Sequence, residues 1–307
     1  MVIAKRLVSL ILLMLLAALL ARGLFEFIPG DKARLVLGER ASDTELKAWN
    51  HAHGYDRPLR LRLAGYVAGL AHGDLGVSDT EGANRPVWQV LKNRLPATMK
   101  LAMAAGLFGA ALGLFLALLW ARFPGSALDS ALEFLTSLGL VVPTFVLGPL
   151  LIWLFAVVLG WLPSGELNGL ASYPLPVIAL SSGFAAYLAR FGRALLNAEL
   201  GRDYCRAARA RGLTQFMTLA KHALPNAAVP LLTAISLQVA ALLGGAILTE
   251  VIFRWPGIGE LTVKAVQRHD LDLVAAIVMW GVLIYGLLVG IADVLILAID
   301  PVAREGG

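Results

Sequence analysis

Long apolar runs dominate this chain of 307 residues and restrict it to folds that can place such runs in a membrane. Hydrophobic residues make up 58% of the sequence and the mean hydropathy is +0.75, which exceeds what the core of a soluble domain needs. The one cysteine, Cys205, excludes an internal disulfide, and we interpret it as a small packed residue. The predicted fold class is therefore an all-α membrane protein.

One stretch between the apolar runs, from Asp203 to Pro225, is too basic to cross a membrane and must form a structured loop on one face of the bilayer. Asp203 is predicted to cap a short helix from Tyr204 to Arg211, and Gly212 fits the left-handed residue that closes such a helix. Thr214 is predicted to cap a second helix, which Pro225 interrupts. The predicted element is a helix, a turn and a second helix.

The spacing of the side chains gives this element two different faces. In the second helix, apolar residues recur at steps of three and four: Phe216, Leu219, Ala220, Ala223 and Leu224. In the first helix, the same spacing places three cations on one face: Arg202, Arg206 and Arg209. One apolar face and one cationic face suit docking into a partner protein.

Six apolar segments are interpreted as membrane spans. The first follows Lys5 and Arg6, and we expect it to remain uncleaved because Arg22 to Phe25 lacks a small-x-small cleavage site. The predicted spans are 1–28 and, approximately, 96–120, 128–159, 175–196, 229–249 and 274–299. Pro143 and Pro149 in the third span require neighbouring groups or water to satisfy freed carbonyls, so we expect it inside a bundle or beside a cavity.

The second predicted span carries a close-packing signal. Gly109 and Gly113 form a GxxxG step, which lets the backbone of another helix approach closely. We expect this step to pack helices.

The long polar segment from Pro29 to Pro96 is predicted to face outward. Its middle part, from Pro58 to Leu70, is amphipathic and is expected to lie along the membrane surface or against the bundle. His51 and His53 suggest a metal site, but two histidines in a polar loop without a thiol or carboxylate set beside them are more typical of solvated residues. A metal role for this pair stays an open alternative.

Positive charges are distributed asymmetrically between the two sides of the predicted topology. Eleven lie on one side: Lys5, Arg6, Arg122, Arg190, Arg193, Arg202, Arg206, Arg209, Arg211, Lys221 and Arg304. Three lie in the short loops opposite: Arg254, Lys264 and Arg268. The positive-inside rule predicts both termini and the basic loop in the cytoplasm, and it explains the net charge of +5 better than nucleic-acid binding does.

Within the basic loop, Arg206-Ala207-Ala208 is followed by Gly212 and then, after nine residues, by His222-Ala223-Leu224-Pro225. This spacing resembles the cytoplasmic loop of ABC importer permeases, which has the form E-A-A, three residues, G, nine residues and I-x-L-P. Two positions depart from that form, because Arg206 replaces the Glu and His222 replaces the Ile. The sequence around the loop is similar to that of the oligopeptide, dipeptide and nickel branch of the family.

A second segment, near the end of the fifth predicted span, carries the same resemblance. It is similar to the family's E-x-x-F-x-x-P-G-[IL]-G at Glu250, Phe253, Pro256, Gly257, Ile258 and Gly259. Two earlier stretches, Gly73 to Ser78 and Arg85 to Ala102, also look like the family's entry into its second span. The resemblance therefore covers most of the chain from Gly73 onward.

The resemblance implies a type I ABC importer permease fold with six transmembrane helices, in a bacterial inner membrane. It implies a second homologous permease subunit, two cytoplasmic ATP-binding subunits and an extracytoplasmic solute-binding protein as partners. The solute would be a short peptide or a related solute such as nickel or a metal chelate, moved by alternating access. No catalytic residue, cofactor or metal is expected in this chain.

The expected organisation is a first transmembrane helix at 1–28, an extracytoplasmic segment at 29–96 and a five-helix core at 97–307. The core would contain an ATPase-docking loop at 197–227. By the resemblance, the coupling residues of this loop are Asp203, Tyr204, Arg206, Ala207, Ala208, Arg209, Gly212, Leu224 and Pro225.

The main alternative is a secondary, proton-coupled transporter. Such a carrier is expected to have a network of Asp, Glu or His near the membrane midplane. The few ionisable residues within the predicted spans include Glu133 and Asp293, which lie one to two turns from the cytoplasmic ends of their helices. The sequence also lacks a Walker P-loop and an HExxH motif, so neither ATP hydrolysis nor zinc protease activity is expected from the chain itself.

Overall fold

The computed structural model describes residues 2–26, 32–38, 40–52, 54–78, 80–81 and 85–299, and within these ranges the chain is mostly helical. It divides into two compact units: Met1–Pro96 with Gly257–Gly286, and Ala97–Pro256 with Leu287–Gly307. Helices α5 (Val87–Arg122) and α13 (Leu271–Ile299) each contribute residues to both units.

The first unit contains the N-terminal helices and a small hairpin. Its elements are α1 (Val2–Glu26), α2 (Lys32–Leu37), α3 (Asp43–Ala52), α4 (Leu59–Ala71), β1 (Val77–Ser78), β2 (Arg85–Pro86), α12 (Ile258–Gln267) and the first parts of α5 and α13. A capping box starts α3, because the Ser42 N–H donates to Glu45 Oε2 at 2.8 Å and Ser42 Oγ accepts from the Glu45 N–H at 3.3 Å. Helix α4 covers nearly all of the segment predicted to be amphipathic.

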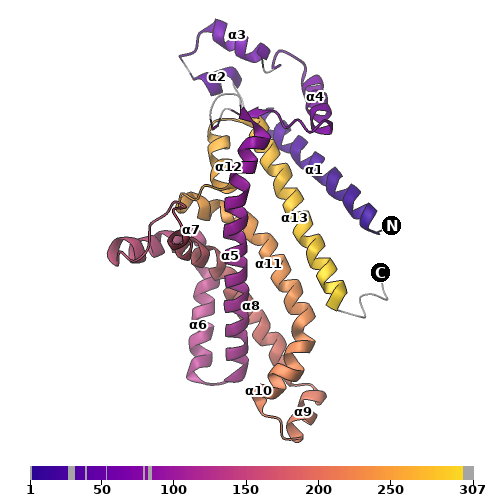
Figure 1. Cartoon of the computed structure of the whole chain (residues 1–307), viewed down its shortest axis with the longest axis vertical. Coiled ribbons are helices and arrows are strands. Elements are labelled where there is room, and N and C mark those ends of the chain that lie inside the picture. Colours follow the sequence, from indigo (N-terminus) through magenta and orange to yellow (C-terminus); the bar gives the residue numbers. More distant parts are fainter. Residues whose placement is uncertain are drawn as a thin grey trace. The chain divides into compact units, whose positions relative to one another are not determined.

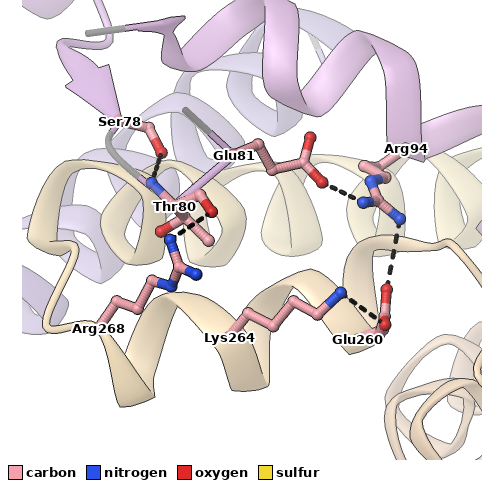
Figure 2. A network of polar contacts seen from close by, with 7 residues as sticks. All are labelled: Ser78, Thr80, Glu81, Arg94, Glu260, Lys264 and Arg268. Carbon is pink, nitrogen blue, oxygen red and sulfur yellow. Dashed lines mark hydrogen bonds and ion pairs between the residues drawn. The ribbon is translucent and has the colours of Figure 1, made fainter. Parts of the chain in front are cut away.

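A polar network holds the hairpin in the first unit (Figure 2). Arg94 of α5 forms ion pairs with Glu81 and with Glu260 of α12, the latter at 3.3 Å. Lys264 reaches the same Glu260 at 2.7 Å. A two-stranded hairpin this short is not stable by itself, so these side chains connect it to the helices.

The second unit is a helical bundle (Figure 1). Its elements are the rest of α5, α6 (Ala127–Val141), α7 (Thr144–Leu151), the π-helix η1 (Ile152–Val158), the 3-10 helix η2 (Leu170–Ser172), α8 (Pro174–Leu200), α9 (Asp203–Ala210), α10 (Gln215–Thr218), the π-helix η3 (Leu219–Ala223), α11 (Leu224–Ile252) and the end of α13. Residues of α8 are buried along most of its length, and α6, α7 and α11 pack against it. The core of this unit is therefore built around α8.

The GxxxG step on α5 lies against α8, as the sequence predicts for a packing signal. A Cβ on Gly109 would lie 2.6 Å from the Phe184 ring, and a Cβ on Gly113 would lie 2.9 Å from the Ala185 carbonyl oxygen. A backbone oxygen cannot move aside as the end of a side chain can. The two helices therefore approach as closely as glycine allows.

Among the described residues, four helices are long and apolar enough to cross a membrane: Val87–Arg122, Leu170–Leu200, Gln215–Leu242 and Leu271–Ile291. The number becomes five if α6 and the helix of α7 and η1 form one span, although they meet at a bend of 106°. Helix α1 contributes a shorter apolar stretch, Val8–Gly23. The helical, multi-pass fold class is confirmed, and the number six stays a prediction.

The third predicted span is not one continuous helix, and this corrects the sequence analysis. The chain leaves α6 at Val142, whose φ of -77° and ψ of 113° are extended, and α7 begins after Pro143. Proline disfavours helical backbone at the residue before it, so Pro143 ends the helix at Val142. Pro149 stays inside α7, and the helix then widens into η1.

The contact at Gly113 yields a matched pair of substitutions. Gly113→Ala places a methyl group against the α8 backbone and should destabilise the solubilised protein by about 1–3 kcal/mol, the usual cost of overpacking. Gly244→Ala is the control, because no atom of the described residues lies within 4 Å of a Cβ at that helical position, and it should be neutral or slightly stabilising. Thermal unfolding in detergent measures both. Equal unfolding temperatures would contradict the proposed close contact.

Candidate functional site

The basic loop lies at one end of the second unit, where α9 and α10 extend beyond the bodies of α8 and α11 (Figure 1). Helix α8 ends at Leu200 and α9 begins at Asp203, so the first helix of the loop follows a span almost directly. The loop is thus attached to the bundle through elements of the core.

The turn between α9 and α10 is fixed by Gly212, as predicted. Its φ is +93°, in the left-handed region. The Gly212 N–H donates to the Arg209 carbonyl at 2.9 Å and the Leu213 N–H donates to the Ala208 carbonyl at 3.3 Å. This pair of bonds is a Schellman motif, which satisfies the last carbonyls of α9. No heavy atom of the described residues lies within 4 Å of a Cβ at Gly212, so backbone conformation alone favours glycine here.

The two helix starts agree with the sequence analysis at one position and differ at the other. Thr214 caps α10, because its side chain accepts from the Met217 N–H at 3.2 Å. Asp203, predicted as the cap of α9, is instead its first helical residue, and Arg202 holds the cap position without a side-chain capping hydrogen bond. The Asp203 carboxylate in the first turn still faces the positive end of the helix dipole.

Pro225 does not interrupt the second helix, which corrects another prediction. Helix α10 continues through η3 into α11, and residues Gln215 to Leu242 form one helical span. A proline ring clashes with the carbonyl four residues before it, and the five residues of η3 that precede the first turn of α11 have the wider π geometry. Asn226 Nδ2 donates to the His222 carbonyl at 2.7 Å and so satisfies an acceptor in this turn.

The arginines of the loop are not simply a solvated cationic face. The Arg206 guanidinium donates to the Gly201 carbonyl at 3.0 and 3.1 Å, and Arg209 donates to the Leu200 carbonyl at 3.1 Å. Cations and donors at the carboxyl end of a helix stabilise its unpaired carbonyls. Arg206 and Arg209 therefore fasten α9 to the end of α8.

Tyr204 makes a second connection to α8. Its hydroxyl donates to the carboxylate of Glu199, a residue that is itself buried. Burial, and then the hydrogen bond to Glu199, raise the pKa of Tyr204 well above its usual value, so it remains a neutral donor. The pairing joins residues on either side of the α8 to α9 junction.

Cys205 packs in the core of the second unit, next in sequence to Tyr204, and is completely buried. Burial raises the pKa of its thiol. A protonated, buried thiol is a poor nucleophile, so the structure agrees with the packing interpretation of this residue.

The apolar face predicted for the second helix divides into a buried part and an exposed part. Leu219 and Ala223 are buried in the core, but Phe216 is 61% exposed and Met217 is 47% exposed. Four exposed residues of the same loop carry positive charge: Arg206, Arg209, Arg211 and Lys221. The loop therefore exposes the Phe216 ring and the Met217 thioether among positively charged side chains. Its backbone is connected to helices α8 and α11. Such a surface suits docking of a partner protein.

The second motif segment contains a buried polar pair that the sequence analysis missed. Glu250, at 0% exposure, accepts a hydrogen bond from the Thr98 hydroxyl at 2.6 Å. Trp255 Nε1 donates to the Ala97 carbonyl at 3.0 Å. These bonds fasten the end of α11 to α5. Because the partners are more than 150 positions apart, no local pattern could have indicated the pairing.

No group of three or more His, Cys, Asp or Glu that could hold a metal occurs in the described part of the chain. His51 lies at the end of α3 and is exposed, whereas His53 falls outside the described residues. A metal role for His51 and His53 therefore stays an open alternative.

Two family models match the sequence. The binding-protein-dependent transport system inner membrane component matches residues 109–305, and the N-terminal region of the binding-protein-dependent transport system membrane component matches residues 1–102. The chain is 35% identical over 306 residues to the glutathione transport system permease protein GsiC of Salmonella choleraesuis (strain SC-B67) and of Escherichia coli (strain K12). Both matches cover 98% of this chain and 98% of the relative.

The fold also has solved neighbours. An inward-facing structure of the MetNI methionine ABC transporter is similar with a TM-score of 0.55 and 20% identity, over 71% of this chain and 99% of that chain. A crystal structure of an amino acid ABC transporter with histidines is similar with a TM-score of 0.51 and 18% identity, over 67% of this chain and 92% of that chain. Both indicate the fold of the bundle.

Proposed function

The chain belongs to the family of binding-protein-dependent transport system inner membrane components, and from this premise we propose that its basic loop is where the ATP-binding partners act on it. The chain is a permease subunit of an ABC importer and a multi-pass inner-membrane protein, and ATP hydrolysis belongs to its partner subunits. The sequence left a secondary, proton-coupled transporter as the alternative. Membership of this family excludes that alternative.

The docking proposal rests on how the loop is built. The loop exposes several side chains, of which the largest apolar one is Phe216. The backbone that carries them is fixed by the left-handed turn at Gly212. It is also held to the end of α8 by the hydrogen bonds of Arg206, Arg209 and Tyr204. The proposed coupling residues are Asp203, Tyr204, Arg206, Ala207, Ala208, Arg209, Gly212, Leu224 and Pro225. Cys205 and Ala208 face inward and hold the element in place.

The coupling path follows from the same connections. A displacement of α9 is transmitted to α8 through its carboxyl-terminal carbonyls, and a displacement of α10 moves α11 directly because the helix is continuous. Helices α8 and α11 pack on each other, so the two inputs converge in the core. We infer that ATP-driven closure of the partners reorients the bundle by this route, in a six-span permease paired with a second homologous subunit and served by a solute-binding protein.

A glycine pair tests the coupling role. Gly212→Val forces a β-branched residue into a left-handed conformation, at a cost of about 1 kcal/mol or more, and should lower transport and solute-stimulated ATPase activity of the assembled complex several-fold while expression stays normal. Gly125→Val is the matched control, because Gly125 also has positive φ and open space but lies in the α5 to α6 turn. Its activity should stay near the unmodified level. Full transport by Gly212→Val would refute the docking assignment.

The proposed orientation, with both termini and the basic loop in the cytoplasm, rests on the asymmetry of positive charge. Asn168→Cys, exposed between η1 and α8, should react with an impermeant maleimide in intact cells. Ala127→Cys, exposed at the start of α6, should react only after the membrane is opened. Native Cys205 should remain silent in both conditions because it is buried. Labelling of Ala127→Cys in intact cells would reverse the topology.

The proposed solute is a short peptide of the glutathione type, with nickel or a metal chelate as the other member of the class. Support comes from the relatives named for glutathione transport, at 35% identity over nearly the full chain. Glutathione should stimulate ATP hydrolysis by the complex reconstituted with its binding protein, and a nickel chelate should not. Stimulation by the chelate alone would assign the chain to metal uptake instead.

A further inference from the structure

The connection between η1 and α8 lies against the turn that follows α11, and both belong to the second unit. The two backbones approach closely, because a Cβ on Gly165 would lie 2.4 Å from the Phe253 carbonyl oxygen. The Glu166 N–H donates to the same oxygen at 2.9 Å. The Glu166 carboxylate also forms an ion pair with Arg254 at 3.3 Å. Glu166, the Phe253 carbonyl and Arg254 thus join two segments that are distant in the sequence.

Glu166 and Arg254 both have left-handed backbone, with φ of 65° and 51°. Helix α11 ends in a Schellman motif, in which the Trp255 N–H donates to the Glu250 carbonyl at 2.7 Å. Arg254 holds the position of this motif where glycine is usual. A residue with a Cβ is strained there, and such strain gathers at clamps and switches. Arg254 therefore pairs with Glu166 from a position that backbone conformation alone would give to glycine.

This polar contact is weaker than the apolar packing beside it. The side chains of Arg254 and Glu166 are 76% and 53% exposed, and an exposed ion pair contributes little stability. The strain of two left-handed residues opposes that contribution. Phe253, by contrast, is 1% exposed and packs in a core cluster with residues of α8, against which Leu162 of the connection also packs. The polar contact can therefore break while the apolar core stays packed.

Helix α11 connects this contact to the docking loop. Helices α10, η3 and α11 follow one another without a break from Gln215 to Ile252, so the contact lies roughly 55 Å along one helix from the start of α10. A displacement of α10 is therefore carried to Phe253. Packed helices shift by about 1–2 Å in coupled transitions. A hydrogen bond of 2.9 Å does not survive a shift of this size, whereas apolar contacts have no fixed direction and adapt to it.

We propose that Glu166, the Phe253 carbonyl and Arg254 form a latch, closed in this structure, that opens in each transport cycle when the ATP-binding partners displace α10. The inference rests on the proposed coupling through α10 and α11. Opening loses one hydrogen bond and one ion pair, and it frees Glu166 to leave the left-handed region, so that relief of strain offsets part of the loss. The closed and open states are therefore close enough in free energy for the partners to shift the balance between them.

Hydrogen exchange in the assembled, unmodified transporter with its binding protein reports the latch directly, because the Glu166 amide donates to the Phe253 carbonyl. A non-hydrolysable ATP analogue should raise the exchange rate of this amide about tenfold. The Asn168 amide, which donates to Ser172 Oγ at 3.2 Å, is the control and should not change. Unchanged exchange at Glu166 overturns the latch. Faster exchange at Glu166 without any change in residues 203–217 would support the latch and count against the docking assignment instead.

A cross-link tests whether the latch has to open. Glu166→Cys with Arg254→Cys, joined by a short bifunctional thiosulfonate, holds the latch closed and should lower transport about tenfold until a reductant cleaves the link. Ser42→Cys with Glu45→Cys, an exposed pair at the start of α3, is the matched control and should transport equally before and after reduction. Native Cys205 is buried and should not react with the reagent. Full transport with the latch cross-linked overturns the proposal.

Discussion

The contact of α5 with α8 at Gly109 and Gly113 is the constraint on which the second unit depends, because Gly109 leaves room for the Phe184 ring and Gly113 lies against the α8 backbone at Ala185. Helices in a bilayer gain little from the hydrophobic effect when they associate, so short-range packing has to supply the attraction. With α8 fixed in this way, α6, α7 and α11 surround it. The basic loop is then carried by a helix that cannot shift without repacking the core.

Whether a helix ends at a proline depends both on the proline itself and on the groups around it. Pro143 ends a helix, because Val142 before it adopts an extended conformation. Pro225 does not end one, because η3 widens the preceding turn and the Asn226 side chain bonds to a carbonyl of that turn. The same residue type therefore lies at a bend of 106° between α6 and α7 and within a continuous helix from α10 to α11. A proline leaves the carbonyl four residues before it without its helical hydrogen bond. A helix can continue through a proline where a neighbouring group bonds to a carbonyl of the preceding turn, as Asn226 does here.

The sequence could predict features that depend on a few adjacent residues. The left-handed turn at Gly212 and the cap at Thr214 were predictable for this reason, and so was the packing role of the GxxxG step. Periodicity also identified which residues share a helix face, but it could not tell what covers that face. Phe216 is exposed and Leu219 is buried because the core reaches only one side of the helix. The pairs Tyr204 with Glu199 and Thr98 with Glu250 depend on three-dimensional placement, which no spacing rule contains.

Arg206 occupies the position of the Glu in the family form that the loop resembles. This replacement has a structural consequence. A glutamate could not donate to the Gly201 carbonyl, whereas the guanidinium does so through two nitrogens. Arginine at this position therefore ties the first helix of the loop to the end of α8 by main-chain acceptors, which neither titrate nor depend on a partner side chain. Under the proposed coupling, force on α9 would reach α8 through a short, rigid connection. The second helix needs no such connection because it is already the first part of α11.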